Sequence, residues 1–331
     1  MQGVGRICRV PIACILYVQK RILRRETYME AVQKKRSFLS NLKLQTYLMI
    51  TPTVLMIVLF GIYPILYVLF YSFTNYNGMS APDFVGFTNY IRVLQDSSWW
   101  LTVKNTFQIG IVVSLIQVPI ALILAIMVSG KLKASGFFRA VLFLPSITST
   151  AIMGIVFYFL FASYNGYVNE ILIAANMIEN PISWLGDGLM AKGVIVSFLS
   201  WHDIGFFMLL FLAALQKIPG DVYESAKIDG ANTLQTFMKI TVPMLGKMFQ
   251  IISMLSIVNA LKLFDSVKSL TNGGPGSDTE VMTMYIYRYF FENTGIPQQG
   301  YASAVSIVAT LIVGGVAIIY LLFTKKMNYE D

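Results

Sequence analysis

The chain has 331 residues, of which 56% are hydrophobic and only 13% are charged. Soluble domains carry about 25% charged residues, so this composition, with a mean hydropathy of +0.64, excludes an ordinary water-soluble protein and indicates a polytopic membrane protein. The net charge of +8 is explained by membrane topology, as argued below, and gives no support to nucleic-acid binding.

The first segment, residues 1–46, is rich in Lys and Arg and is predicted to be a basic arm. Its apolar run 7–18 is short, is interrupted by Arg9 and lacks a cleavage site of small residues, so it does not have the form of a signal peptide. The sequence leaves two alternatives open for residues 1–28. Residues 1–28 either belong to the mature chain or are an upstream extension, with Met29 as the true start.

Six apolar stretches follow, each close to the length of about 20 residues that crosses a bilayer. They are continuous rather than alternating, so they are predicted to be helices, one of the two structures that satisfy their backbone groups inside a bilayer. The predicted spans are 47–73, 103–129, 140–162, 191–215, 247–263 and 302–323. The sequence therefore predicts an all-α membrane domain over 47–323, followed by a short tail, 324–331.

The charges fix a predicted orientation. Lys and Arg gather in the arm, the tail and the loops 130–139 and 216–246. The alternate loops, near 74–102, 163–190 and 264–301, carry few basic residues and more acidic ones. The positive-inside bias predicts a multi-pass protein of the plasma or inner membrane with both termini in the cytoplasm.

The loop 216–246 is predicted to form a cytoplasmic helix–turn–helix. In its first half, Asp221 has the position of a helix cap, and Glu224 completes the spacing of a capping box. Gly230 suits the positive φ at the end of that helix. An apolar face is formed by Val222, Tyr223 and Ala226.

The second half of the loop repeats the pattern. Asn232 and Gln235 have capping-box spacing, and Pro243 is predicted to end the helix. Helical spacing predicts an apolar face of Leu234, Phe237, Met238 and Thr241. Two roles fit Glu224: a helix cap, or a contact with a partner protein.

This loop resembles the EAA loop of permease subunits of binding-protein-dependent ABC importers. The matching positions are Glu224, Ser225, Ala226, Asp229, Gly230, Ala231, Ile240 and Pro243. The chain departs from the family pattern at Ser225 and Val242. Four further segments support the resemblance to this family: Phe84–Tyr90, Asn105–Thr106, Leu144–Pro145 and Phe264–Asp265. The segment Thr271–Pro275 is similar to a signature of the first permease subunit of maltose-type sugar importers.

The resemblance implies a type I ABC importer permease fold and a heteromeric machine. Its expected partners are a second permease subunit, a dimer of ABC ATPases, an extracytoplasmic solute-binding protein, a sugar substrate and the lipid bilayer. The loop 216–246 would dock on one ATPase and couple its motion to the spans. No cofactor is expected on this chain, and the resemblance does not identify the sugar or the type of cell envelope.

Polar residues within the later spans are candidates for the substrate path. A charged side chain in a bilayer costs at least about 2.5–3.5 kcal/mol, so His202 and Asp203 are expected to face a cavity or a partner helix. His202 fits a neutral packing role equally well. The full candidate set is Trp201, His202, Asp203, Asn259, Phe264 and Asp265. The family also implies an outer-mouth loop at Gly273, Gly274 and Pro275.

Several motifs are absent from the sequence. There is no phosphate-binding loop and no catalytic or metal-binding constellation, so ATP hydrolysis is expected on a separate subunit. Cys8 and Cys14 match no metal or redox motif and are expected to stay reduced in the cytoplasm. The alternatives are a stand-alone secondary transporter, a membrane scaffold or receptor, and a membrane enzyme. The first of these predicts inverted repeats and several deep acidic residues.

Overall fold

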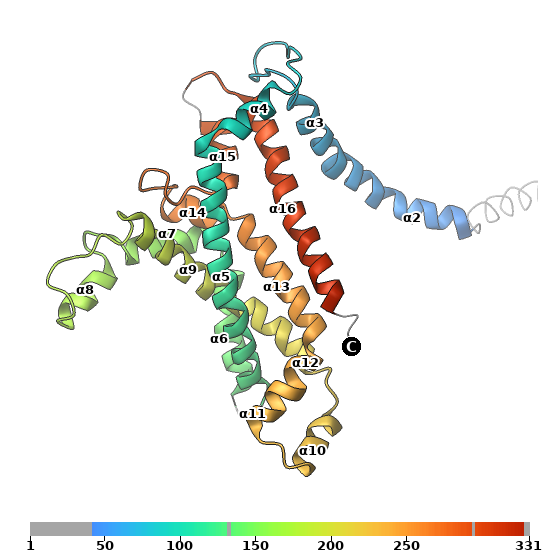
Figure 1. The fold of residues 1–331 in the computed structure, drawn as a ribbon, viewed down its shortest axis with the longest axis vertical. Helices are drawn as coiled ribbons and strands as arrows, with labels where there is room; N and C mark the ends of the chain where they lie inside the picture. Colours follow the sequence, from blue (N-terminus) through green and yellow to red (C-terminus); the bar gives the residue numbers. More distant parts are fainter. Residues whose placement is uncertain (1–41, 131–133, 293–294, 328–331) are drawn as a thin grey trace, which may run out of the picture. The chain divides into compact units, whose positions relative to one another are not determined.

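The computed structural model describes residues 42–130, 134–292 and 295–327, which are mainly helical (Figure 1). The predictions that concern Cys8, Cys14 and Met29 lie outside these residues. The chain divides into two compact units, Met1–Tyr67 and Val68–Asp331.

Helix α2 (Leu42–Ile57) of the first unit continues through a π-helical turn, η1 (Val58–Ile62), into α3 (Tyr63–Tyr71), within which the boundary between the units falls. Together they give a continuous apolar helix from Gln45 to Tyr71, long enough to cross a membrane. Pro52 lies inside α2.

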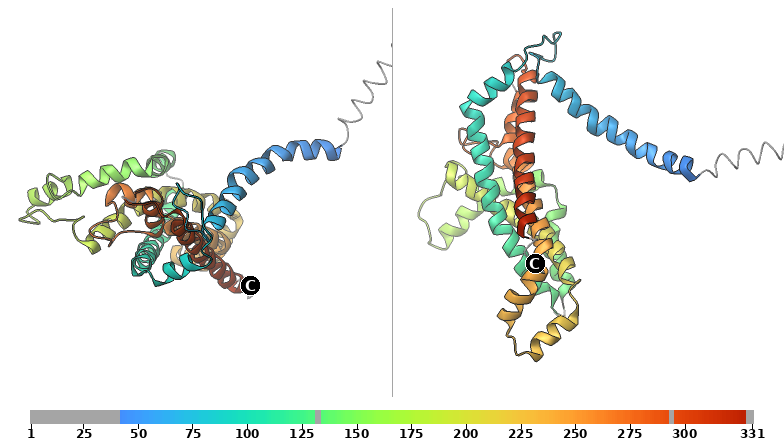
Figure 2. Two further views of the ribbon diagram at one scale, coloured as in Figure 1. Left: turned by 90° about the horizontal axis from the view of Figure 1, so that it is seen from above. Right: turned by 45° about the vertical axis from the view of Figure 1, so that its right-hand side comes forward.

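The second unit contains the remaining helices (Figure 1). Its helices are α4 (Thr88–Gln95), α5 (Ser97–Ser129), α6 (Ser135–Ile147), α7 (Thr150–Leu160), α8 (Tyr167–Ala174), α9 (Gly188–Leu215), α10 (Gly220–Ile228), α11 (Thr233–Thr236), η2 (Phe237–Thr241), α12 (Val242–Met244), α13 (Gly246–Leu261), α14 (Asp265–Leu270), α15 (Met282–Tyr287), η3 (Arg288–Glu292) and α16 (Gln299–Met327). Within this unit, α10 and α11 lie at one end and α4 and α15 at the other, as Figure 1 and the right-hand view of Figure 2 show.

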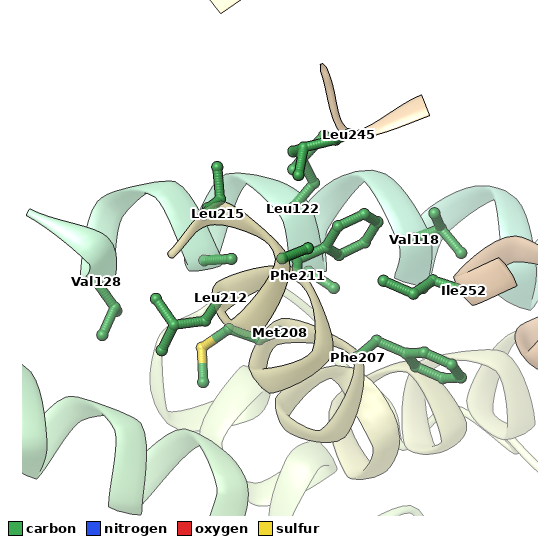
Figure 3. Packing of buried hydrophobic residues seen from close by; sticks show 13 residues of the cluster. Val118, Leu122, Val128, Phe207, Met208, Phe211, Leu212, Leu215, Leu245 and Ile252 are labelled. Atoms are coloured by element: carbon green, nitrogen blue, oxygen red, sulfur yellow. The ribbon is translucent and has the colours of Figure 1, made fainter. Parts of the chain in front are cut away.

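The core of this unit forms where α5, α9 and α13 pack together. Figure 3 shows Leu122 of α5 beside Phe211 of α9, with Ile252 of α13 close by. Small residues allow the helices to approach closely, as is common in membrane bundles. Thus a Cβ added at Gly110 would lie 3.4 Å from the Cβ of Ala260 on α13.

Four of the six predicted spans are continuous helices. They cover Gln45–Tyr71, Ser97–Ser129, Gly188–Leu215 and Gln299–Lys325. The second and third of these begin earlier than predicted because Asp96 and Asp187 cap them. Each carboxylate accepts hydrogen bonds from two backbone N–H groups of the first turn.

Of the other two predicted spans, 140–162 is bent, whereas 247–263 matches the unbroken helix α13, with a bend just before it. The predicted span 140–162 is not one straight helix, because α6 and α7 meet at 94°. Thr148 and Ser149 have extended backbones between them, with ψ of 154° and 124°. Helix α13 likewise meets the preceding helix, Thr233–Met244, at 71°. The total of six holds when each bent pair is counted as one span.

Candidate functional site

The first helix of the predicted helix–turn–helix is present, but its predicted capping box is not. Helix α10 begins at Gly220 with Pro219 as its N-cap, so Asp221 lies inside the first turn rather than before it. Consequently no side chain caps this helix, and the capping role predicted for Asp221 and Glu224 is wrong. The side chain of Glu224 is exposed and makes no hydrogen bond with the described part of the chain.

The turn that follows is a Schellman motif. Gly230 has the predicted positive φ, +78°. The backbone N–H of Ala231 donates to the carbonyl of Ala226 at 2.9 Å, and that of Gly230 to the carbonyl of Lys227 at 3.1 Å. Ala226 is buried, whereas Ser225 and Asp229 are exposed. The direction of the chain between the two helices is therefore fixed by its own backbone.

The second capping box is confirmed. The N–H of Gln235 donates to Oδ1 of Asn232 at 2.8 Å, and the N–H of Asn232 donates to Oε1 of Gln235 at 2.9 Å. Pro243 does not end this helix as predicted, since it lies inside α12. The π-helical turn η2 precedes it, and proline, which lacks an N–H, is tolerated in the first turn of α12.

The predicted apolar face of the second helix is only half covered. Thr241 is buried, Phe237 and Ile240 are partly buried, but Leu234 and Met238 are 69% and 58% exposed. Ile228, at the end of α10, is 86% exposed. Large exposed apolar side chains beside a rigid turn are typical of a contact surface for another protein.

The two polar residues of the fourth predicted span contact each other but differ in exposure. His202 is 4% exposed, and its Nε2 lies 3.3 Å from the carbonyl oxygen of Thr148, at the break between α6 and α7. Its Nδ1 lies 2.6 Å from Oδ1 of Asp203, whose side chain is 36% exposed. The packing role fits His202, whereas Asp203 and the neighbouring Trp201 present exposed surface.

The remaining path candidates lie where α13 gives way to α14. Asn259 and Asp265 are exposed. Phe264 is partly buried between the two helices, with its ring 4.9 Å from that of Tyr287.

The predicted outer-mouth loop is anchored to α5. The side-chain amide of Asn105 donates to the carbonyl of Ser277 at 3.0 Å and to that of Glu280 at 3.1 Å. The backbone N–H of Met282 donates to Oγ1 of Thr106 at 3.0 Å. Sequence reasoning did not assign Asn105 a role in the site. The signal was available, because a buried amide inside an apolar helix needs hydrogen-bond partners.

A groove of about 900 Å³ lies beside this loop. Lys268 faces it and donates to Oδ1 of Asn272 at 2.9 Å. Aromatic and polar groups line the groove together, among them Tyr158, Phe159, Ser163, Tyr164, Asn272, Gly274 and Pro275. Gly273 is buried with a φ of +84°.

At the same end of the unit, Asp96 joins α5 to α15 and α16. Its Oδ2 accepts from the hydroxyl of Tyr301 at 2.6 Å and also from the hydroxyl of Tyr285. Burial alone would raise the pKa of Asp96, but the two phenols and two backbone N–H groups stabilise the carboxylate and lower the pKa below its usual value. Burial and the contact with Asp96 raise the pKa of Tyr285.

Comparison with known proteins gives a family and a fold. The family described as "Binding-protein-dependent transport system inner membrane component" matches residues 117–329. The lactose transport system permease protein LacF of Rhizobium radiobacter is 37% identical over 81% of this chain and 89% of its own length. The arabinooligosaccharides transport system permease protein AraP of Bacillus subtilis is 30% identical over 89% of this chain and 93% of its own.

A solved structure has the same fold. It is a bacterial ABC transporter involved in the import of the acidic polysaccharide alginate. The similarity covers 89% of this chain and 99% of that one, with a TM-score of 0.75 and 20% sequence identity.

Proposed function

Because the chain belongs to the family of binding-protein-dependent transport system inner membrane components, we propose that it is a permease subunit of an ATP-driven carbohydrate importer. As a member, it is a multi-pass membrane protein. The names of its relatives support a carbohydrate substrate: lactose for one, arabino-oligosaccharides for another, and trehalose or maltose for a third, MalF of Thermococcus litoralis. The substrate class is therefore a di- or oligosaccharide.

The observation that carries the coupling step is the rigid, exposed turn between α10 and α11. Its backbone is locked by the Schellman motif and the capping box, while the side chains of Glu224, Ile228 and Leu234 are exposed. A rigid projection transmits force, and an exposed charge among apolar groups suits a protein partner. The loop 216–246 docks on a separate ATPase subunit. Since Glu224 forms no cap, partner contact is its proposed role.

The proposed assembly contains a second permease subunit, a pair of ATPases and an extracytoplasmic solute-binding protein. Both termini face the cytoplasm, because the basic loops 130–139 and 216–246 lie on the side of the ATPases. The loop around Gly274 and Pro275, with its groove of aromatic and polar groups, forms the outer mouth.

Transport then proceeds by alternating access. Closure of the ATPases on ATP moves α10 and α11, and the spans switch from an inward-facing to an outward-facing state as the binding protein releases sugar. The sugar must interact differently with the two states for this switch to drive net transport. Asp203, Asn259 and Asp265 are the polar groups proposed to meet it within the membrane.

The test is uptake into vesicles that contain the permease pair, the ATPases and the binding protein. Labelled lactose, maltose and an arabino-oligosaccharide serve as substrates. Concentrative uptake of at least one sugar is expected with ATP, and none when the ATPases are omitted, even under an imposed proton gradient. Accumulation without the ATPases would favour the stand-alone secondary transporter.

In the same vesicles, Glu224→Ala removes the proposed contact with the ATPase. A lost hydrogen bond to a charged group is worth about 1.5–3 kcal/mol, so uptake and sugar-stimulated ATP hydrolysis are expected to fall by at least about tenfold. The control is Glu179→Ala, which removes an exposed acid from the loop 163–190. Equal uptake by both variants at matched expression would refute the coupling role of Glu224.

A further inference from the structure

A second hollow, separate from the groove beside the outer-mouth loop, lies between that loop and η3. Its volume is about 410 Å³. It is lined by Ser277, Glu280, Arg288, Tyr289, Glu292 and Gln298, and we refer to it as the Glu280 pocket. These side chains are almost all polar or charged, which distinguishes this hollow from a gap between apolar helices.

Glu280 is the central feature of the pocket, since its side chain is 3% exposed. Arg288 neutralises it: Nη1 lies 3.0 Å from Oε1, but its hydrogen bond goes to Oε2, at 3.2 Å. Oε1 is buried, and its contact with Nη1 of Arg288 lacks the geometry of a hydrogen bond. Burial raises the pKa of Glu280, whereas the charge of Arg288 and hydrogen bonds with Ser277 and Arg288 oppose that rise.

Gln298 provides a second acceptor of the same kind. Its Oε1 is also buried and accepts no hydrogen bond within the part of the chain that the structure describes. Buried polar atoms in proteins nearly always have a hydrogen-bond partner. The unpartnered oxygen of Gln298, beside a Glu280 oxygen that has an ion pair but no hydrogen bond, therefore calls for donors from outside the chain. The donors must belong to a group that fits within the pocket.

The charges of the pocket favour a neutral ligand over an ion. Glu280 is paired with Arg288, and Glu292 is paired with Lys268 at the rim. The two acids and two bases cancel, so neither a cation nor an anion would gain a net attraction. A neutral molecule that carries several hydroxyl groups satisfies the site, because each hydroxyl both donates and accepts a hydrogen bond.

An aromatic ring completes the chemistry of the pocket. Tyr289 is partly exposed and packs edge-on at 5.0 Å against Tyr301, which orients its ring. Sites for small molecules combine such rings with a few placed polar groups. Arg288 is 38% exposed, so its guanidinium can also donate to a ligand oxygen.

From these observations we propose that the Glu280 pocket binds one sugar unit of the transported carbohydrate, with its hydroxyl groups donating to Glu280 and Gln298. The pocket lies at the end of the unit that carries the outer-mouth loop. It therefore holds the sugar after release from the binding protein and before entry into the path through the membrane. This inference rests on the proposed function, because it takes the ligand class from it.

The test uses the full-length chain in its complete transporter, reconstituted in nanodiscs. Lactose, maltose and an arabino-oligosaccharide are added separately, and hydrogen exchange is followed in peptides that cover 277–298. One of these sugars is expected to slow exchange in these peptides. Calcium chloride is the probe for a cation site, and slowing by calcium but by none of the sugars would overturn the assignment.

Two variants connect binding to the pocket. Glu280→Gln keeps the volume of the side chain and removes its charge, and Gln298→Ala removes the second acceptor without touching the ion pair. Each is expected to raise the sugar concentration needed for half-maximal protection by about 10-fold or more. Glu179→Gln is the control and should leave the sugar concentration for half-maximal protection unchanged. Unchanged protection in both pocket variants, with normal melting temperatures, would overturn the proposal.

Uptake measurements on the same preparations separate the two claims. If the wild-type transporter accumulates a sugar that protects nothing between 277 and 298, the pocket inference fails and the proposed function stands. If a sugar protects the pocket but the complete transporter accumulates none of the three, the proposed function fails and the binding site stands.

Discussion

His202 and Gly205 lie one turn apart on α9, and both face the neighbouring helix α6. His202 reaches the carbonyl of Thr148, which the break between α6 and α7 leaves without a helical partner. At Gly205 a Cβ atom would collide with the carbonyl oxygen of Leu142. The sequence showed His202 beside Asp203, but its contact with Thr148 could not be predicted because the two residues are 54 positions apart.

Gly205→Ala is therefore expected to destabilise the protein by about 1–3 kcal/mol, the usual cost of overpacking a well-packed core. Gly193→Ala is the matched control in the same helix, where an added Cβ meets no atom within 4 Å. That change should be neutral or stabilising by up to about 1 kcal/mol. Thermal unfolding of both variants in detergent measures the difference, and equal melting temperatures would contradict the close contact at Gly205.

The Asp96 carboxylate gives a prediction about pH. Its pKa in the folded protein is lowered, so its hydrogen bonds stabilise the fold while the group is ionised in both states. That stability is lost as pH falls below the usual value of 3.8 and through the lower pKa of the folded state. Asp96→Asn should melt below the wild type at neutral pH, and the gap should narrow as pH falls through this range. A gap that does not change with pH would contradict the prediction.

At the scale of elements, caps and turns that involve nearby residues could be predicted from the sequence. The residues at which helices begin were harder to predict. The capping box of Asn232 and Gln235 and the turn at Gly230 involve residues within three or four positions, so sequence spacing sufficed. The capping box at Asp221 failed because Pro219 starts α10 earlier than the spacing suggested. Pro145 lies just before the bend between α6 and α7, so the sequence carries a local signal for a break there. The contact of Thr148 with His202 of α9 has no such local signal.

Gly230→Ala is the prediction that belongs to this scale. A left-handed backbone costs an L-residue about 1–2 kcal/mol, so the turn between α10 and α11 should loosen. Sugar-stimulated ATP hydrolysis by the complete transporter is expected to fall, while global melting changes little. Gly220→Ala, at the start of the same helix where an added Cβ meets no atom, is the control. Normal stimulation in Gly230→Ala would show that the rigidity of the turn is not needed.

At the scale of the whole molecule, hydropathy predicted the number of spans but not how the later segments meet. Asn105 of α5 contacts a loop more than 170 positions away, and Asp96 contacts Tyr301 across 205 positions. These contacts arise only when the helices pack together. The helix–turn–helix of the loop 216–246 could be located from sequence because its defining residues all lie within one short segment.

Transport itself provides the prediction for the path. Asp203→Ala is expected to change the rate or the sugar selectivity of uptake, because the carboxylate is the exposed half of its pair with His202. The control is Ser197→Ala, which alters an exposed residue nearer the start of the same helix. Uptake that keeps both its rate and its selectivity would remove Asp203 from the path.

The way Asn105 holds the outer-mouth loop has a consequence for evolution. Its amide donates to the main-chain carbonyls of Ser277 and Glu280, which every residue type possesses. The anchor therefore places no demand on the identity of those two residues. The side chains of the loop can change during evolution, as the protein adapts to a different transported molecule, while the loop stays attached to α5. Across family members with different cargoes, positions equivalent to 105 and 106 should vary less than those equivalent to 277 and 280.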